Sequence, residues 1–150
     1  MTRSRVDVEF DINASPEIVM SALHVVERLP EWSPSHHKVQ IESTDAAGLP
    51  DRVTMELSFL KFIDHEVVDY EWRDDFMSWN VVSSKLLTYQ RGTYLLSPRA
   101  DGTHAVYSFE FESKVPMPKF LLEKFRKLAA ETPTKYFAPF AESYATTDAR

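Results

Sequence analysis

The sequence contains no cysteine, and only three of its 150 residues are glycine. Without thiols the chain can form neither disulfides nor a cysteine-ligated zinc site. Gly48, Gly92 and Gly102 are isolated from one another, which excludes the glycine-rich phosphate-binding loops of Rossmann and P-loop proteins. A chain of this length buries enough surface to fold without cross-links. We therefore expect a single domain spanning residues 1–150.

Long apolar runs and an excess of positive charge are also missing. The hydrophobic stretches are only a few residues long, far short of the ~20 residues that a membrane-spanning helix needs. The formal net charge is -6, whereas nucleic-acid affinity comes mainly from clustered lysine and arginine. The sequence therefore predicts a cytoplasmic protein with no integral membrane segment and no nucleic-acid partner.

Aromatic residues, in contrast, make up 13% of the chain, and much of it alternates apolar and polar residues. The alternation in residues 5–12, and again from about Lys38 to Phe111, is typical of strands with one buried face. Asp101-Gly102 marks the clearest hairpin turn. We predict seven strands. Their shared buried face carries Val53, Met55, Leu57, Phe59, Val68, Tyr70, Trp72, Met77, Trp79, Tyr94, Leu96, Tyr107, Phe109 and Phe111.

Two short helices are predicted between the first two strands. Ser15 followed by Pro16 is typical of a helix start, because serine caps the helix and proline needs no N–H partner there. That helix should run to about Val26 or Glu27. Two prolines within Leu29–Pro34 interrupt the pattern, which favours a short second helix or a turn.

The last helix is predicted over residues 118–144, where apolar side chains recur at helical spacing. At 1.5 Å per residue, this segment would span about 40 Å, enough to cross a whole sheet. Pro133 and Pro139 lie inside it. Two interpretations remain open: the prolines kink the helix, or Thr132 caps a further helix that begins at Pro133.

The order of these elements defines an α+β fold. One antiparallel sheet of seven strands must bury its aromatic face, and only the last helix is long enough to cover it. A sheet that curves strongly around one helix leaves space that side chains do not fill. We therefore expect a cavity between the sheet and the C-terminal helix.

Four short segments lie at the predicted element boundaries: Ala14-Ser15-Pro16-Glu17, Pro30-Glu31-Trp32, Asp101-Gly102-Thr103 and Lys114-Val115-Pro116-Met117-Pro118. Together with the element order they resemble the START/Bet v 1-like (SRPBCC) superfamily, from about Val6 to Tyr144. Within it the chain looks most like the bacterial polyketide cyclase/dehydrase and coenzyme Q-binding branch. The resemblance implies a helix-grip fold, a curved seven-stranded antiparallel sheet wrapped around a long C-terminal helix. It implies less about function, because the members include carriers, receptors, cyclases and hydrolases.

Tyrosines on the buried face favour a ligand cavity over a plain core. The hydroxyls of Tyr70, Tyr94 and Tyr107 must each find a partner, or burial costs about 1–3 kcal/mol. Phenylalanine would fill a core without that penalty. Gln90 and Ser83 would add polar groups if they share this face. The predicted ligand-binding residues line the two walls of the cavity: Trp32, Phe59, Tyr70, Trp79, Tyr94, Tyr107, Phe111, Phe125, Leu128, Thr132 and Tyr136.

Few residues suggest catalysis or metal binding. His36 and His37 are adjacent, so on a strand they point to opposite faces and cannot share a metal ion. Strand parity places several acidic residues outward: Glu56, Asp69, Glu71, Glu110 and Glu112. Arg91, which the resemblance suggests as a substrate-orienting cation, also has outward parity, but a bulge at Gly92 would reverse it, and its side remains open. We predict no metal and no cofactor, and we identify no catalytic residue.

The function predicted from these features is binding or transport of a small hydrophobic ligand, such as a lipid, a quinone or a polyketide-like molecule. The protein would act as a monomer or a weak homodimer. The alternative is a polyketide cyclase/dehydrase-type enzyme that uses the same cavity. A third hypothesis is an interaction protein with a collapsed cavity. A buried titratable residue within hydrogen-bond reach of two inward tyrosines would favour the enzyme, and an exposed apolar patch would favour the interaction protein.

Overall fold

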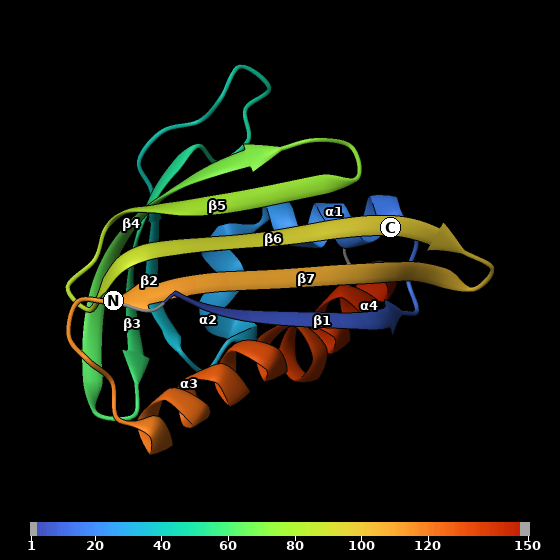
Figure 1. Cartoon of the computed structure of the whole chain (residues 1–150). Coiled ribbons are helices and arrows are strands. Elements are labelled where there is room, and N and C mark those ends of the chain that lie inside the picture. The colour runs from blue at the N-terminus through green and yellow to red at the C-terminus, as the bar shows by residue number, and fades with distance from the viewer. Residues whose placement is uncertain (1–2, 148–150) are drawn as a thin grey trace.

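A computed structural model describes residues 3–147, and side chains as far as residue 144. Seven antiparallel strands form one sheet in the order β1-β7-β6-β5-β4-β3-β2, and the sheet curves over the C-terminal helix (Figure 1). The strands are β1 (Ser4–Ile12), β2 (His36–Ile41), β3 (Arg52–Phe59), β4 (Phe62–Trp72), β5 (Phe76–Ser83), β6 (Leu87–Arg99) and β7 (Gly102–Ser113). The predicted α+β helix-grip fold is confirmed.

Short helices connect β1 to β2, as predicted. They are α1 (Pro16–His24), the 3₁₀-helix η1 (Val26–Arg28) and α2 (Leu29–Trp32). The Ser15 side chain accepts a hydrogen bond from the backbone N–H of Ile18, so it caps α1 as expected. The first helix ends two to three residues earlier than predicted, because Val25 leaves the helical conformation at φ -86° and ψ 63°.

The C-terminal helix runs through both prolines without ending. It comprises α3 (Lys119–Glu131), the π-helix η2 (Thr132–Phe137) and α4 (Ala138–Thr147). The alternative in which Thr132 caps a new helix is wrong, because its backbone is helical and its hydroxyl donates to the carbonyl of Leu128 at 2.8 Å. The wider π turn accommodates Pro133, whose carbonyl accepts from the N–H of Ala138, five residues on.

The concave face of the sheet carries the predicted apolar side chains toward α3. The rings of Phe111 and Phe59 lie 4.5 and 5.0 Å from that of Phe125 on α3. One strand extends further than its predicted apolar residues: β4 begins at Phe62, six residues before Val68, the first of its residues on the predicted buried face. Its early start adds two carboxylic acids to the concave face, which the sequence analysis missed. Within residues 3–147, no helix is long and apolar enough to cross a bilayer.

Candidate functional site

A cavity of about 560 Å³ lies between the concave face of the sheet and the helices. This volume falls within the roughly 300–1,000 Å³ of typical small-molecule sites. Its walls come from β2 to β7 on one side and from α1, η1, α2, α3 and the start of η2 on the other. Most of the lining side chains are apolar or aromatic, so the space suits an apolar molecule.

The cavity opens where its lining residues are exposed to solvent. These residues are Phe62 at the β3–β4 turn, Lys85 between β5 and β6, and Lys114, Val115, Pro116 and Pro118 between β7 and α3. Figure 1 shows the three connections on the same side of the molecule. Exposed apolar residues gather in the same segments, with Ile63 at 56% and Val115 at 65% relative exposure. A ligand would enter between these loops.

Nine of the eleven predicted ligand-binding residues line the cavity: Trp32, Phe59, Tyr70, Trp79, Tyr94, Tyr107, Phe125, Leu128 and Thr132. Phe111 does not, because it lies in the closed core against Phe125. Tyr136 does not line it either. The π turn brings the residue five places after Thr132 inward, so the fully buried Phe137 packs against Trp32 with ring centroids 5.4 Å apart. Tyr136 is half-buried outside the cavity.

Three tyrosines form part of the cavity wall with unused hydroxyl groups. Tyr70, Tyr94 and Tyr107 are 9%, 3% and 3% exposed, and the rings of the last two lie 5.0 Å apart. Burial raises the pKa of all three phenols, so they stay protonated. Among the described residues, none makes a hydrogen bond with these hydroxyls. They are therefore available to a polar group inside the cavity.

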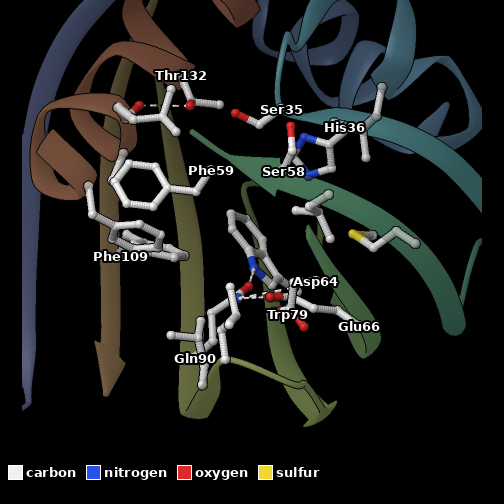
Figure 2. A pocket seen from close by; sticks show the side chains of 18 of the residues that line it. Ser35, His36, Ser58, Phe59, Asp64, Glu66, Trp79, Gln90, Phe109 and Thr132 are labelled. Atoms are coloured by element: carbon white, nitrogen blue, oxygen red, sulfur yellow. Dashed lines mark hydrogen bonds between the residues drawn. The ribbon is translucent and has the colours of Figure 1, made fainter. Parts of the chain in front are cut away.

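Two buried acids, Asp64 and Glu66, lie on the same face of β4 as Tyr70, each 4% exposed. Figure 2 shows them beside Gln90 and Trp79 in the cavity wall. The amide nitrogen of Gln90 donates to both oxygens of Glu66 at 3.1 Å, and the indole N–H of Trp79 donates to the Gln90 oxygen at 2.7 Å. Counting back by two from Tyr70 would have placed both acids inward.

The environment of Glu66 favours its protonated form. Burial, and next the hydrogen bond and negative charge of Asp64, raise its pKa to about 8. Asp64 itself is held by the protein: it accepts hydrogen bonds from the Ser84 hydroxyl at 2.5 Å and from the Lys85 backbone N–H at 2.7 Å. Among the side chains described, none of the cations forms an ion pair with either acid.

His36 and the serines beside it form a second polar region of the wall, apart from the acids in Figure 2. The Nδ1 atom of His36 lies 2.6 Å from the Ser33 hydroxyl. Burial, and then the nearby His37, lower the pKa of His36 to about 4, so its ring is neutral. His37 instead contacts the Ser58 hydroxyl at 2.6 Å. No group of three potential metal ligands occurs within the described part of the chain.

Arg91 lies on the convex face of the sheet, outside the cavity. The pairing of β6 with both neighbours is continuous through Gly92, so no bulge reverses its direction. Its guanidinium donates to the side-chain oxygen of Asn80 at 3.3 Å. Of the two residues predicted to add polar groups to the cavity, Gln90 lines it, whereas Ser83 is exposed and does not line it.

Seven strands gripping a C-terminal helix, with a ligand-sized cavity between them, define a protein of the START/Bet v 1-like class. The chain belongs to the family described as polyketide cyclase / dehydrase and lipid transport, which matches residues 3–138. The family resemblance predicted from the sequence is therefore confirmed. A comparison with curated proteins found no match.

Solved structures similar to this one support the fold. A START superfamily protein from Mycobacterium smegmatis has a TM-score of 0.78 at 19% identity, covering 93% of this chain and 94% of its own. A protein from Thermus thermophilus has a TM-score of 0.78 at 17% identity, covering 98% and 100%. The Zhui aromatase/cyclase from Streptomyces sp. R1128 has a TM-score of 0.79 at 12% identity, covering 99% and 97%. At these identities the likeness shows the fold alone.

Proposed function

We propose that this protein binds a small hydrophobic molecule, of the lipid, quinone or polyketide-like kind, in the cavity between the sheet and α3. The observation that carries the proposal is an apolar cavity of about 560 Å³ whose wall includes three tyrosines with no hydrogen-bond partner for their hydroxyls among the described residues. Burial of the ligand's apolar surface, at about 25 cal/mol per Å², would supply affinity. The tyrosines and the acid network would orient it. The cytoplasmic location and the monomeric or weakly dimeric state are parts of this proposal.

Binding without chemistry has better support than the cyclase/dehydrase alternative. A catalytic acid or base needs hydrogen-bond reach to the groups it works with. Glu66 is buried and titratable, but its hydrogen bonds go to Gln90 rather than to two tyrosines. The collapsed-cavity hypothesis has less support still, because a cavity of about 560 Å³ lies between the sheet and the helices.

The test uses native mass spectrometry on protein purified from its own host, followed by calorimetric titration with 1-decanol as a simple apolar probe. We expect a co-purifying hydrophobic species and measurable decanol binding. Leu128→Trp, which adds bulk to the cavity wall, should weaken decanol binding by about tenfold or more.

The matched control is Lys127→Trp, which adds the same side chain to an exposed position of the same helix. It should leave decanol binding unchanged. A clean mass together with no decanol binding by the wild-type protein would overturn the proposed function, and would favour an interaction protein.

A further inference from the structure

Asp64 and Glu66 form an acid pair that faces the cavity without a compensating cation. Both residues are 4% exposed and both line the cavity. Burying carboxylates away from water is strongly unfavourable unless they are paired and hydrogen-bonded. The only lysines that line the cavity, among the residues described, are the exposed Lys85 and Lys114, and neither forms an ion pair with the acids. The pair therefore has no cationic partner among the described residues.

The protein anchors this pair from one side and leaves the cavity side open. Ser84 and the backbone N–H of Lys85 hold Asp64, while Gln90 holds Glu66 and is itself held by Trp79. These donors keep the carboxyl groups in position. None of them supplies a charge, so the protein's own contacts leave the pair electrostatically incomplete.

Unpartnered tyrosine hydroxyls provide a second, independent indication of a polar ligand group. Tyr70 lies four residues from Glu66 on the same face of β4, and its ring stands 6.4 Å from that of Trp79. Tyr94 and Tyr107 continue this wall and are each 3% exposed. Each of these hydroxyls can donate or accept a hydrogen bond, and no protein group among the described residues uses it. A polar group placed beside the acids would find both an anionic acceptor and neutral hydroxyls.

We propose that the cavity selects an apolar molecule that carries a protonated amine, with the nitrogen donating hydrogen bonds to Asp64 and Glu66. This rests on the proposed function and names the ligand class for the same cavity. An anionic head group would be repelled by Asp64. A neutral alcohol would fill the space but leave the acid pair without a counter-charge, whereas an ammonium group supplies both the charge and the donors.

The proposal requires that binding releases a proton. Burial and the neighbouring Asp64 raise the pKa of Glu66 to about 8, so in the empty protein it carries a proton below that pH. An ammonium group beside Glu66 favours its ionised form, so this proton leaves to solvent. The other titratable groups that line the cavity, among the residues described, are Tyr70 on the same strand, Tyr94, Tyr107, His36, Lys85 and Lys114. Burial raises the pKa of the three tyrosines and lowers that of His36 to about 4, so these four groups stay neutral throughout the range of about pH 6 to 8.

The experiment is calorimetric titration of the full chain with three probes that share one alkyl chain: n-decylamine, 1-decanol and decanoic acid. We expect decylamine to bind at least about tenfold more tightly than decanol at pH 8. Its affinity should rise up to about tenfold per pH unit between pH 6 and 8, because one proton is released. Repeating the titration in buffers of different ionisation enthalpy would measure the number of protons released on binding. Decanol affinity should not change with pH.

Glu66→Gln keeps the shape of the side chain and removes its charge. It should lower decylamine affinity about tenfold or more and abolish proton release, and the loss of decylamine affinity should exceed any change in decanol affinity. The control is Glu71→Gln, the same change on the same strand but on the exposed, convex face. It should preserve both the decylamine affinity and the proton release.

The outcomes separate the two proposals. Decanol binding without a preference for decylamine, tightest binding of decanoic acid, or amine binding unaffected by Glu66→Gln would each overturn the amine inference and leave the binding function intact. Failure of all three probes to bind would overturn both.

Discussion

At the scale of single residues, Gly92 and Trp79 are closely packed neighbours on adjacent strands. They are paired across β5 and β6, and a Cβ atom on Gly92 would overlap the six-membered ring of the indole. The missing side chain therefore lets Trp79 lie flat over β6, where its N–H reaches Gln90. Through Gln90 this small residue helps to position Glu66.

Gly92→Ala should lower the free energy of unfolding by about 1–3 kcal/mol, because the indole has to move out of a packed position. The measurement is urea unfolding of the variant and the wild type. In a Trp79→Phe background the same substitution should cost less, since the smaller ring leaves room for the methyl group. Equal costs in both backgrounds would contradict this packing.

The residues that line the candidate site were only partly predictable from the sequence. Alternation alone correctly put the three tyrosines on the concave face. The two acids were not predicted. Polar residues on the face of a strand that is expected to be buried break the apolar alternation, so the pattern does not extend the strand over them. Their burial depends on Ser84, Gln90 and Trp79, which lie on other strands and loops and are adjacent only in the folded chain.

At the scale of elements, the β3–β4 turn carries backbone strain at the cavity opening. Phe59 pairs with Phe62, so Leu60 and Lys61 form a two-residue turn. Leu60 has a φ of 55° and is the only non-glycine residue in the described chain with a positive φ. A two-residue turn with a positive φ at its first position is the pattern that favours glycine there.

Leu60→Gly should raise the free energy of unfolding by up to about 1 kcal/mol. The relief of backbone strain exceeds the packing energy lost with the side chain, because that side chain is 58% exposed. Lys61→Gly is the control: without a positive φ to relieve, it should destabilise the protein by about 0.5–1 kcal/mol. Urea unfolding measures both changes. A destabilised Leu60→Gly variant would show that the turn carries no relievable strain.

The C-terminal helix was predicted from the sequence, but the direction of its side chains after the prolines was not. The two prolines were visible, but a helical period of 3.6 residues wrongly turned Tyr136 toward the cavity. A π turn changes the helical phase and turns Phe137 inward instead. Packing against Trp32 and Tyr94 stabilises that arrangement. Both residues lie far from the helix in the sequence, so the helix sequence alone does not predict these contacts.

For the whole molecule, two buried groups make stability depend on pH in opposite directions. Glu66 titrates at about 8 rather than 4.5, so the folded state binds an extra proton between these values and stability falls as pH rises through them. His36 titrates at about 4 rather than 6.5, so stability falls as pH drops through that window. The two effects oppose each other between about pH 4.5 and 6.5, and above that range the loss from Glu66 is no longer offset.

Glu66→Gln should therefore be more stable than the wild type, by an amount that grows from near zero at about pH 4.5 to the order of a few kcal/mol at pH 8. Urea unfolding across this range measures the difference. The raised pKa of His104, caused by the hydrogen bonds of its ring with Asp11 and Glu9, acts on both proteins alike and cancels. Glu71→Gln is the control, and parallel stability profiles for Glu66→Gln and the wild type would contradict the prediction.

Sequence by itself determined the fold of this protein, because alternation, helical spacing and capping residues such as Ser15 act between neighbours along the chain. It also determined that an aromatic face must be covered by the last helix. The tertiary structure alone decided the size of the cavity and the inward phase of Phe137. It also decided that two acids share a wall with Tyr70 and have no cationic partner among the described residues. These features arise from contacts between distant segments, whose geometry and electrostatics exist only once the sheet has curved around α3.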